Sequence, residues 1–144
     1  MQATLILTIG NFPLKFPPYI IFKNTSAKDN DLVENPYEDQ IILRQNKTGW
    51  INEEILKDYL ERLIFNLKFS PDYQIHLILD RCKVHLKNTI IEKLQENQIK
   101  YSFVPSGATG FVQPLDVCIN KPFKDCVRKY YKEWFQKEGI KKII

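Results

Sequence analysis

The stretch Gln74-Ile75-His76-Leu77-Ile78-Leu79-Asp80 decides the fold, because it is a short apolar run that ends in an aspartate. Residues 74–79 are long and apolar enough to form a strand in the centre of a sheet. A helical pattern precedes this run, and residues 86–97 form a second helical pattern after it. A further strand, residues 101–104, ends at Pro105. The alternation of helix and strand predicts parallel strand pairing in an α/β fold, with helices covering the sheet.

The chain before this run has the composition of an antiparallel hairpin. Residues 4–9 and Tyr19–Phe22 are apolar and rich in β-branched side chains, and residues 11–18 between them contain three prolines, which exclude a helix. Residues 24–40 are polar and acidic, which favours a surface excursion, and residues 41–43 could add a short third strand. The sheet is therefore predicted to be mixed.

Two helices can be placed from their first turns. Asn52 suits an N-cap, and Glu53 and Glu54 after it favour the positive end of the helix dipole. Apolar residues then recur with helical spacing at Ile55, Leu56, Tyr59, Leu60, Leu63, Ile64 and Leu67. A last helix is predicted over residues 117–136, with Pro122 in its first turn and an apolar stripe of Phe123, Val127, Tyr130, Tyr131 and Trp134. Trp50 and Trp134 are predicted to be core residues.

Length and composition indicate one domain spanning residues 1–144, with 44% hydrophobic and 26% charged residues. No apolar run approaches the roughly 20 residues that span a bilayer, so a membrane role is not expected. The three cysteines include no CxxC pair, which favours reduced thiols in an intracellular protein. A structural zinc site built from Cys82, His85, Cys118 and Cys126 is disfavoured, because the spacing does not match short zinc loops.

Positive charge is concentrated at the C-terminal end. Residues 119–144 contain eight lysine or arginine residues and three acidic residues, whereas the whole chain carries a net charge of only +4. Such a region can neutralise phosphates. It can equally be the solvated face of an amphipathic helix, which is the more common explanation for charge alone.

Two aspartates are the main candidates for chemistry. Asp80 ends the apolar run, and Asp116 lies just before the last helix, with 35 residues between the two. Functional groups of open α/β sheets gather beyond the carboxyl ends of strands, so both could meet on one side of the sheet. Carboxylates there can bind divalent ions that promote phosphoryl transfer. On spacing alone, a turn residue or a helix cap is the more frequent role of such an aspartate.

The flanks of both aspartates resemble the pogo/Tigger-type DDE transposase family. The segment Leu79-Asp80-Arg81-Cys82-Lys83-Val84-His85 is similar to its LDxxxxH motif, and Gln113-Pro114-Leu115-Asp116-Val117 is similar to its third-aspartate motif. Further segments agree in order: residues 14–23 with KLPPxxIFK, residues 48–52 with SGWM, and residues 104–109 with PPxxT. The resemblance covers roughly residues 4–136. This family includes jerky-like and centromere protein B-like relatives, in which DNA binding outlives catalysis.

The resemblance implies an RNase H-like mixed sheet flanked by helices, and a three-carboxylate site that holds two Mg²⁺ or Mn²⁺ ions. Asp80 and Asp116 match the second and third carboxylates. His85 is either site-proximal or a helix-entry histidine bonded to backbone, and Gln113 either contacts DNA or, as we favour, fixes its loop. Lys121 and Lys124, together with Arg128, are expected to contact DNA phosphates.

The family's first carboxylate lies on an opening strand upstream of the hairpin, and this chain starts at the hairpin. We therefore expect an N-terminally truncated domain that lacks its first strand, with an unpaired sheet edge prone to association. The acids of the excursion are poor substitutes for the first carboxylate; they are Asp29, Asp31, Glu34, Glu38 and Asp39. The two-metal site is expected only if that carboxylate is supplied. Cleavage and joining of DNA in the nucleus is the expected function, and a homodimer is compatible with it.

Two other interpretations stay open. The chain could be a non-catalytic, domesticated remnant that binds DNA or a partner through its basic C-terminal helix, or an interaction domain without a nucleic-acid role. No small-molecule substrate or membrane partner is expected.

Overall fold

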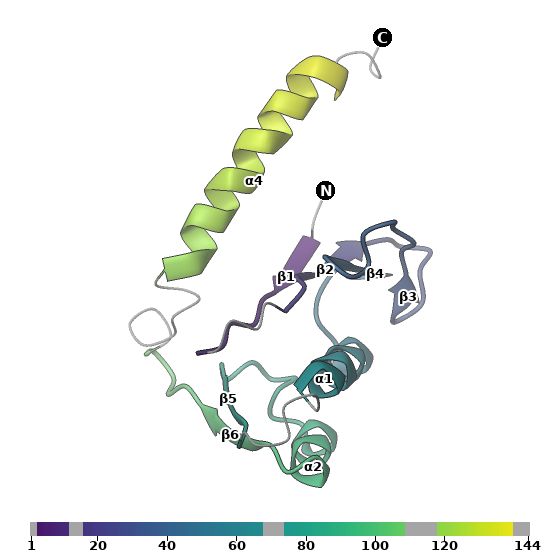
Figure 1. Cartoon of the computed structure of the whole chain (residues 1–144). Coiled ribbons are helices and arrows are strands. Elements are labelled where there is room, and N and C mark those ends of the chain that lie inside the picture. The colour runs from purple at the N-terminus through teal and green to yellow at the C-terminus, as the bar shows by residue number, and fades with distance from the viewer. Residues whose placement is uncertain (1–2, 12–15, 68–73, 109–117, 140–144) are drawn as a thin grey trace. The chain divides into compact units, whose positions relative to one another are not determined.

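A computed structural model describes residues 3–11, 16–67, 74–108 and 118–139 (Figure 1). The chain divides into two compact units, Met1–Val104 and Pro105–Ile144. Strands and helices mix in the first unit, so the predicted α/β class is confirmed. No helix in the described ranges is long and apolar enough to cross a membrane.

A four-stranded mixed sheet forms the first part of this unit. Its order is β1 (Ala3–Ile6), β2 (Tyr19–Lys23), β4 (Ile42–Asn46) and β3 (Asp31–Leu32). β1 and β2 pair antiparallel, which confirms the predicted hairpin, and β2 pairs parallel to β4. The strand predicted over residues 41–43 corresponds to β4, which is longer than predicted and continues to residue 46.

The polar excursion contributes the short strand β3, which the sequence did not predict. Asp31 of β3 pairs with Gln45 of β4 in antiparallel register. The carboxylate of Asp31 also accepts a hydrogen bond of 2.9 Å from the backbone N–H of Lys28. A two-residue strand with an acidic residue lacks the apolar alternation from which strands are recognised.

Helix α1 (Glu53–Leu67) begins where the sequence predicted. The side-chain oxygen of Asn52 accepts a hydrogen bond of 2.9 Å from the backbone N–H of Ile55, as an N-cap does. The apolar residues of its inner face are buried: Ile55, Leu56, Tyr59, Leu60, Leu63 and Ile64. Hydrophobic periodicity alone was therefore sufficient to orient this helix.

A strand–helix–strand segment completes the unit: β5 (His76–Leu79), α2 (Asn88–Glu96) and β6 (Lys100–Phe103). β5 and β6 pair in parallel, as predicted, with His76 opposite Lys100. In α2, Ile90 and Leu94 are fully buried. β5 differs from the prediction in one respect: it lies in a two-stranded sheet with β6 and not in a sheet centre. The apolar composition of β5 was read correctly, but no second neighbouring strand is present among the described residues.

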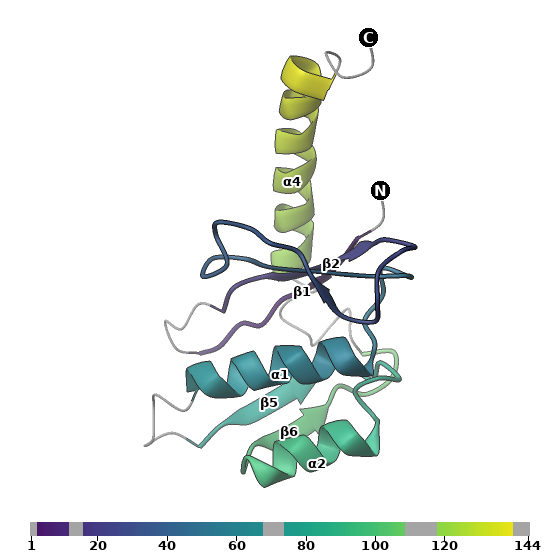
Figure 2. The same ribbon diagram turned by 90° about the vertical axis from the view of Figure 1, so that its right-hand side faces the viewer.

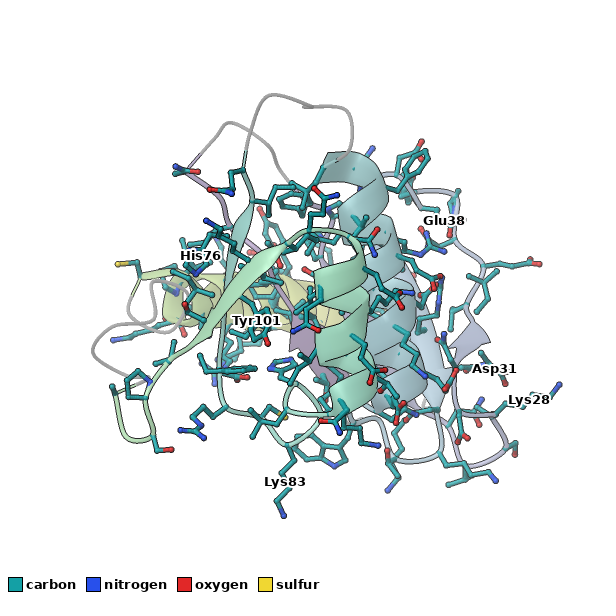
Figure 3. The ribbon with its side chains drawn as sticks, turned by 90° about the horizontal axis from the view of Figure 1, so that it is seen from below. Lys28, Asp31, Glu38, His76, Lys83 and Tyr101 are labelled. Atoms are coloured by element: carbon teal, nitrogen blue, oxygen red, sulfur yellow. The ribbon has the colours of Figure 1, made fainter. Side chains whose placement is uncertain are left out.

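One apolar core joins both sheets to both helices. Buried residues of β2, β4, α1 and α2 form a single cluster, and Ile6 of β1 and Leu77 and Leu79 of β5 pack against it. α1 and α2 run side by side, as Figures 1 and 3 show, and Lys93 Nζ lies 2.5 Å from Glu61 Oε1 between them. The described part of residues 1–104 is therefore one packed unit.

The second unit contains α4 (Asn120–Trp134), which continues as the π-helical turn η2 (Phe135–Gly139). Pro122 lies in the first turn of α4, as predicted. No residue of α4 is buried, and Trp134 is 47% exposed. Trp50 is 60% exposed in the first unit. The prediction that both tryptophans are core residues is therefore wrong, because residue type alone does not fix the direction of a side chain.

Candidate active site around Asp80

Asp80 directly follows β5, at the carboxyl end of a parallel strand pair. Its Oδ1 accepts a hydrogen bond of 3.2 Å from the backbone N–H of Cys82, which forms a local Asx-type turn. The same oxygen lies 2.6 Å from His85 Nδ1. The side chain of Asp80 is nevertheless 41% exposed. It is therefore held in place from one side and open to solvent on the other.

His85 lies in the turn before α2 and not at the start of a helix, because α2 begins only at Asn88. Its Nδ1 also lies 3.1 Å from the backbone oxygen of Asp80. A carboxylate and a carbonyl oxygen can only accept, so Nδ1 carries the proton. The structure thus combines a contact to backbone with a contact to the candidate ligand Asp80. Nε2 is left as an acceptor when the ring is neutral and as a donor when it is protonated.

Asp116 and Gln113 fall within residues 109–117, outside the described residues. The pairing of Asp80 with Asp116 and the role of Gln113 therefore stay predictions. Across the part of the chain that the structure describes, no group of three histidine, cysteine or acidic side chains is arranged to hold a metal ion. Asp80 offers the oxygen donor that a hard cation requires, because its Oδ2 makes no hydrogen bond to any described residue.

The predicted DNA-binding residues lie along α4. Lys121, Lys124 and Arg128 are exposed, and their spacing of three and four positions places them on one side of the helix. Arg128 forms an ion pair of 3.0 Å with Asp125, and both side chains are more than half exposed. Such a pair contributes little to stability, so Arg128 can exchange its partner for a phosphate at small cost.

Comparison with known proteins gives the family. The family model of the DDE superfamily endonuclease matches residues 3–142. The chain belongs to this family. It is 27% identical over 136 residues to "Pogo transposable element with KRAB domain" of Mus musculus and, equally, of Homo sapiens, a match that covers 93% of this chain. It is also 27% identical over 95 residues to the human "Pogo transposable element with ZNF domain", covering 66% of this chain and 7% of that protein.

This DDE family chain spans about a fifth of the length of the two KRAB-domain relatives, since the match covers 21% of each. No solved structure matches it. The family match extends over both compact units and includes the positions of Asp80 and Asp116.

Two basic residues beside Asp80 were not singled out from the sequence. Arg81 and Lys83 are exposed, and neither makes an ion pair with a described residue. Figure 3 shows Lys83 projecting away from the helices and strands of its unit. The signal was available, because both residues lie within three positions of Asp80 in this DDE family chain. They place free positive charge next to the candidate ligand.

Proposed function

We propose that this chain is the catalytic-core segment of a DDE-type transposase that cuts and joins DNA, and that Asp80 is one of its metal ligands. The observation that carries the proposal is how the Asp80 carboxylate is positioned and which of its oxygens has a partner. Its carboxylate follows a strand end, is held by the N–H of Cys82 and by His85, and keeps one oxygen without a partner among the described residues. Membership of the DDE family supplies the class of reaction.

Asp116 is proposed as a second ligand, and the third carboxylate would come from an opening strand that the family resemblance places upstream. In this proposal, residues 3–142, which the family model matches, belong to one RNase H-like domain. A bound Mg²⁺ or Mn²⁺ pair would activate the attacking oxygen and stabilise the leaving oxygen at a phosphodiester. His85 acts as a positioning residue, because its Nδ1–H fixes the orientation of the Asp80 carboxylate.

DNA is the proposed partner and the nucleus the proposed compartment. In this proposal the exposed Arg81 and Lys83 would contact phosphates near Asp80, and Lys121, Lys124 and Arg128 would do so along α4. A homodimer is compatible with this role.

A binding role without cleavage is the second candidate, and α4 favours it. The helix presents its basic side and its aromatic residues to solvent, with no buried residue of its own. Basic side chains contact phosphates, while aromatic rings stack on bases.

Metal binding is tested separately from cleavage. Mn²⁺ is titrated into the isotope-labelled chain, and paramagnetic broadening of backbone NMR signals is recorded. We expect broadening centred on residues 80–85 that is lost in Asp80→Asn and kept in Asp31→Asn, where Asp31 is a half-buried acid of β3. If the broadening of residues 80–85 persists in Asp80→Asn, the assignment of Asp80 as a ligand is wrong. Magnesium-dependent nicking of DNA with pogo-type ends, measured with the same variants, then tests the reaction.

DNA binding is tested by its salt dependence. Each phosphate contact adds about 0.9 to the slope of log affinity against log salt for duplex DNA. Neutralising Lys121, Lys124 and Arg128 together should flatten the slope by as much as about 3. Neutralising Lys28 and Lys47, which are exposed in the first unit, should leave it nearly unchanged. Equal effects of the two sets would contradict a DNA-binding role of α4.

A further inference from the structure

The turn between β4 and α1 is built around a buried asparagine. Asn46, only 2% exposed, ends β4 and accepts hydrogen bonds from the backbone N–H groups of Thr48, at 3.1 Å, and Gly49, at 2.6 Å. Its Nδ2 donates a hydrogen bond of 2.8 Å to the carbonyl oxygen of Trp50. β1 adds a further bond, because the hydroxyl of Thr4 donates to the carbonyl oxygen of Gly49 at 2.7 Å. The backbone of this turn is therefore held from several sides.

Trp50 leaves this turn with its side chain in solvent. It is 60% exposed, and its indole makes no ring contact or hydrogen bond with a described residue. Burial of such a large apolar surface is favourable, and because the backbone beneath it is already ordered, little further entropy is lost when a partner covers it. Tryptophan is also among the residues most enriched at the energetic centres of protein interfaces. Trp50 therefore has the properties of an anchor for a partner.

Two lysines lie at the same turn. Lys23 ends β2 opposite Asn46 in the parallel register, and its Cβ would lie 2.9 Å from a Cβ added at Gly49. Lys47 directly follows Asn46, and Figures 1 and 2 show the chain passing from β4 to α1 at this end of the sheet. Both lysines are exposed, and neither forms an ion pair with a described residue. Trp50 therefore lies beside two uncompensated positive charges.

Acidic groups limit the extent of this positive surface. The side chain of Asn52 donates a hydrogen bond of 2.9 Å to the backbone oxygen of Asp29, which brings an exposed acid to the start of α1. Glu54, in the first turn of α1, has a side chain that is 62% exposed. Single-stranded nucleic acid needs a continuous basic groove and successive aromatic rings, whereas this turn offers one ring and two lysines. A short acidic peptide with one apolar anchor needs no such groove.

From these observations we infer that Trp50, Lys23 and Lys47 form a docking site for an acidic peptide segment of a partner protein, with one phenylalanine as its anchor. The phenylalanine ring packs against the indole of Trp50, and carboxylates on either side of it pair with the two lysines at the rim. Rim ion pairs are screened by salt, so the affinity falls as ionic strength rises. Neither metal ions nor DNA take part in this contact, so the metal and DNA proposals can fail without affecting it.

Tryptophan fluorescence tests the site on the full chain. The probe is a short synthetic peptide of aspartate and glutamate with one central phenylalanine. The chain has two tryptophans, so the variant Trp134→Phe leaves Trp50 as the single emitter. We expect the peptide to shift the emission of Trp50 to shorter wavelength and to protect the indole from acrylamide quenching. Unchanged emission and quenching up to millimolar peptide would overturn the inference.

Variants at exposed positions test the anchor, with the anisotropy of a fluorescently labelled peptide as the measure of affinity. Trp50→Ala should weaken binding about thirtyfold or more, as loss of an energetic centre does, whereas Trp50→Phe should keep most of the affinity. The matched control is Tyr37→Ala, at a position that is 62% exposed, and it should have no effect. All three variants should fold, since neither position is buried. Equal affinities of Trp50→Ala and Tyr37→Ala would show that Trp50 is not the anchor.

Charge variants and a competitor test two rival explanations. The pair Lys23→Gln and Lys47→Gln should weaken peptide binding by about an order of magnitude. The pair Lys129→Gln and Lys132→Gln removes the same charge from exposed positions of α4 and should change the affinity little. Equal losses would assign the peptide to α4 and overturn the inference. A single-stranded thymidine oligonucleotide of the same net charge should leave the peptide bound, and displacement of the peptide would identify a nucleic-acid site instead.

Discussion

Asp58 of α1 connects the helix to the four-stranded sheet, and its removal should cost much of the stability of the first unit. The carboxylate accepts a hydrogen bond of 2.7 Å from the hydroxyl of Tyr19 on β2. It also forms an ion pair of 3.2 Å with Arg44 on β4, whose side chain is only 5% exposed. The guanidinium of Arg44 lies 5.6 Å from the centre of the Tyr19 ring. One carboxylate therefore satisfies a buried cation and a buried hydroxyl.

The expected cost of Asp58→Ala follows from what is left behind. A buried charge that loses its partner costs about 3–5 kcal/mol, and an unsatisfied buried hydroxyl costs about 1–3 kcal/mol. Asp58 is 24% exposed, so water can partly replace it, and the lower halves of these ranges apply. We therefore expect a loss of about 4 kcal/mol in the free energy of unfolding. That is a large share of the roughly 5–15 kcal/mol typical of a domain.

Urea denaturation of the variants measures this cost. Asp58→Asn keeps an acceptor for Tyr19 but removes the charge, so its loss should be smaller, about 2 kcal/mol. The double variant Arg44→Met, Asp58→Leu should recover much of the loss, because an apolar pair leaves no buried charge. A loss below about 1 kcal/mol for Asp58→Ala would refute the reasoning. So would a double variant that is less stable than Asp58→Ala.

Three further predictions concern the backbone and two titrating groups. Gly49 has φ +72°, and a Cβ added there would lie 2.9 Å from a lysine Cβ on β2; at Gly107 φ is +80°, but no atom lies within 4 Å of an added Cβ. Gly49→Ala should therefore destabilise the protein more than Gly107→Ala, and thermal denaturation of the two variants compares them. Hydrogen bonds from Lys87 and from a nearby threonine lower the pKa of Glu53 to about 2 from its usual 4.5. The stability that Glu53 contributes should therefore be lost as pH falls from 4.5 towards 2, and Glu53→Gln should flatten that part of the pH–stability curve. Burial raises the pKa of the Tyr59 hydroxyl, so the stability that the buried Tyr59 contributes should decrease as pH rises past 10. An absorbance titration should then detect the ionisation of Tyr59 only together with unfolding.

Local patterns made the helices predictable. Asn52 and the two glutamates after it gave the start of α1, and the spacing of apolar residues gave its buried face. The apolar run ending at Asp80 gave β5 and its parallel pairing with β6. These features depend on residues close together in the sequence, for which periodicity is a direct physical signal.

Features that depend on distant residues were not predictable. Strand β3 exists because Asp31 and Leu32 reach β4, and nothing within the excursion indicates it. Trp50 points to solvent, because the preceding turn is fixed by Asn46, which accepts a hydrogen bond of 2.6 Å from the N–H of Gly49. Periodicity around a single aromatic residue cannot reveal such a turn.

The candidate site was predictable in part. Asp80 and His85 were singled out from a motif, and the structure places Nδ1 of His85 2.6 Å from the carboxylate of Asp80. The motif could not show that one oxygen of Asp80 is held while the other stays without a partner among the described residues. It also gave no reason to notice Arg81 and Lys83, because surface lysines and arginines are common.

Ion pairing distinguishes Asp80 from Glu53 and Asp58, two other acids of the described residues. Glu53 is neutralised by Lys57 and Lys87, and Asp58 is neutralised by two arginines. A metal ion at either acid would have to displace cations already bound there. Asp80 forms no ion pair with lysine or arginine, and it is held by a backbone N–H and by Nδ1 of His85. It therefore keeps an ordered position and an uncompensated negative charge, which are the two properties that a metal ligand needs before the metal arrives.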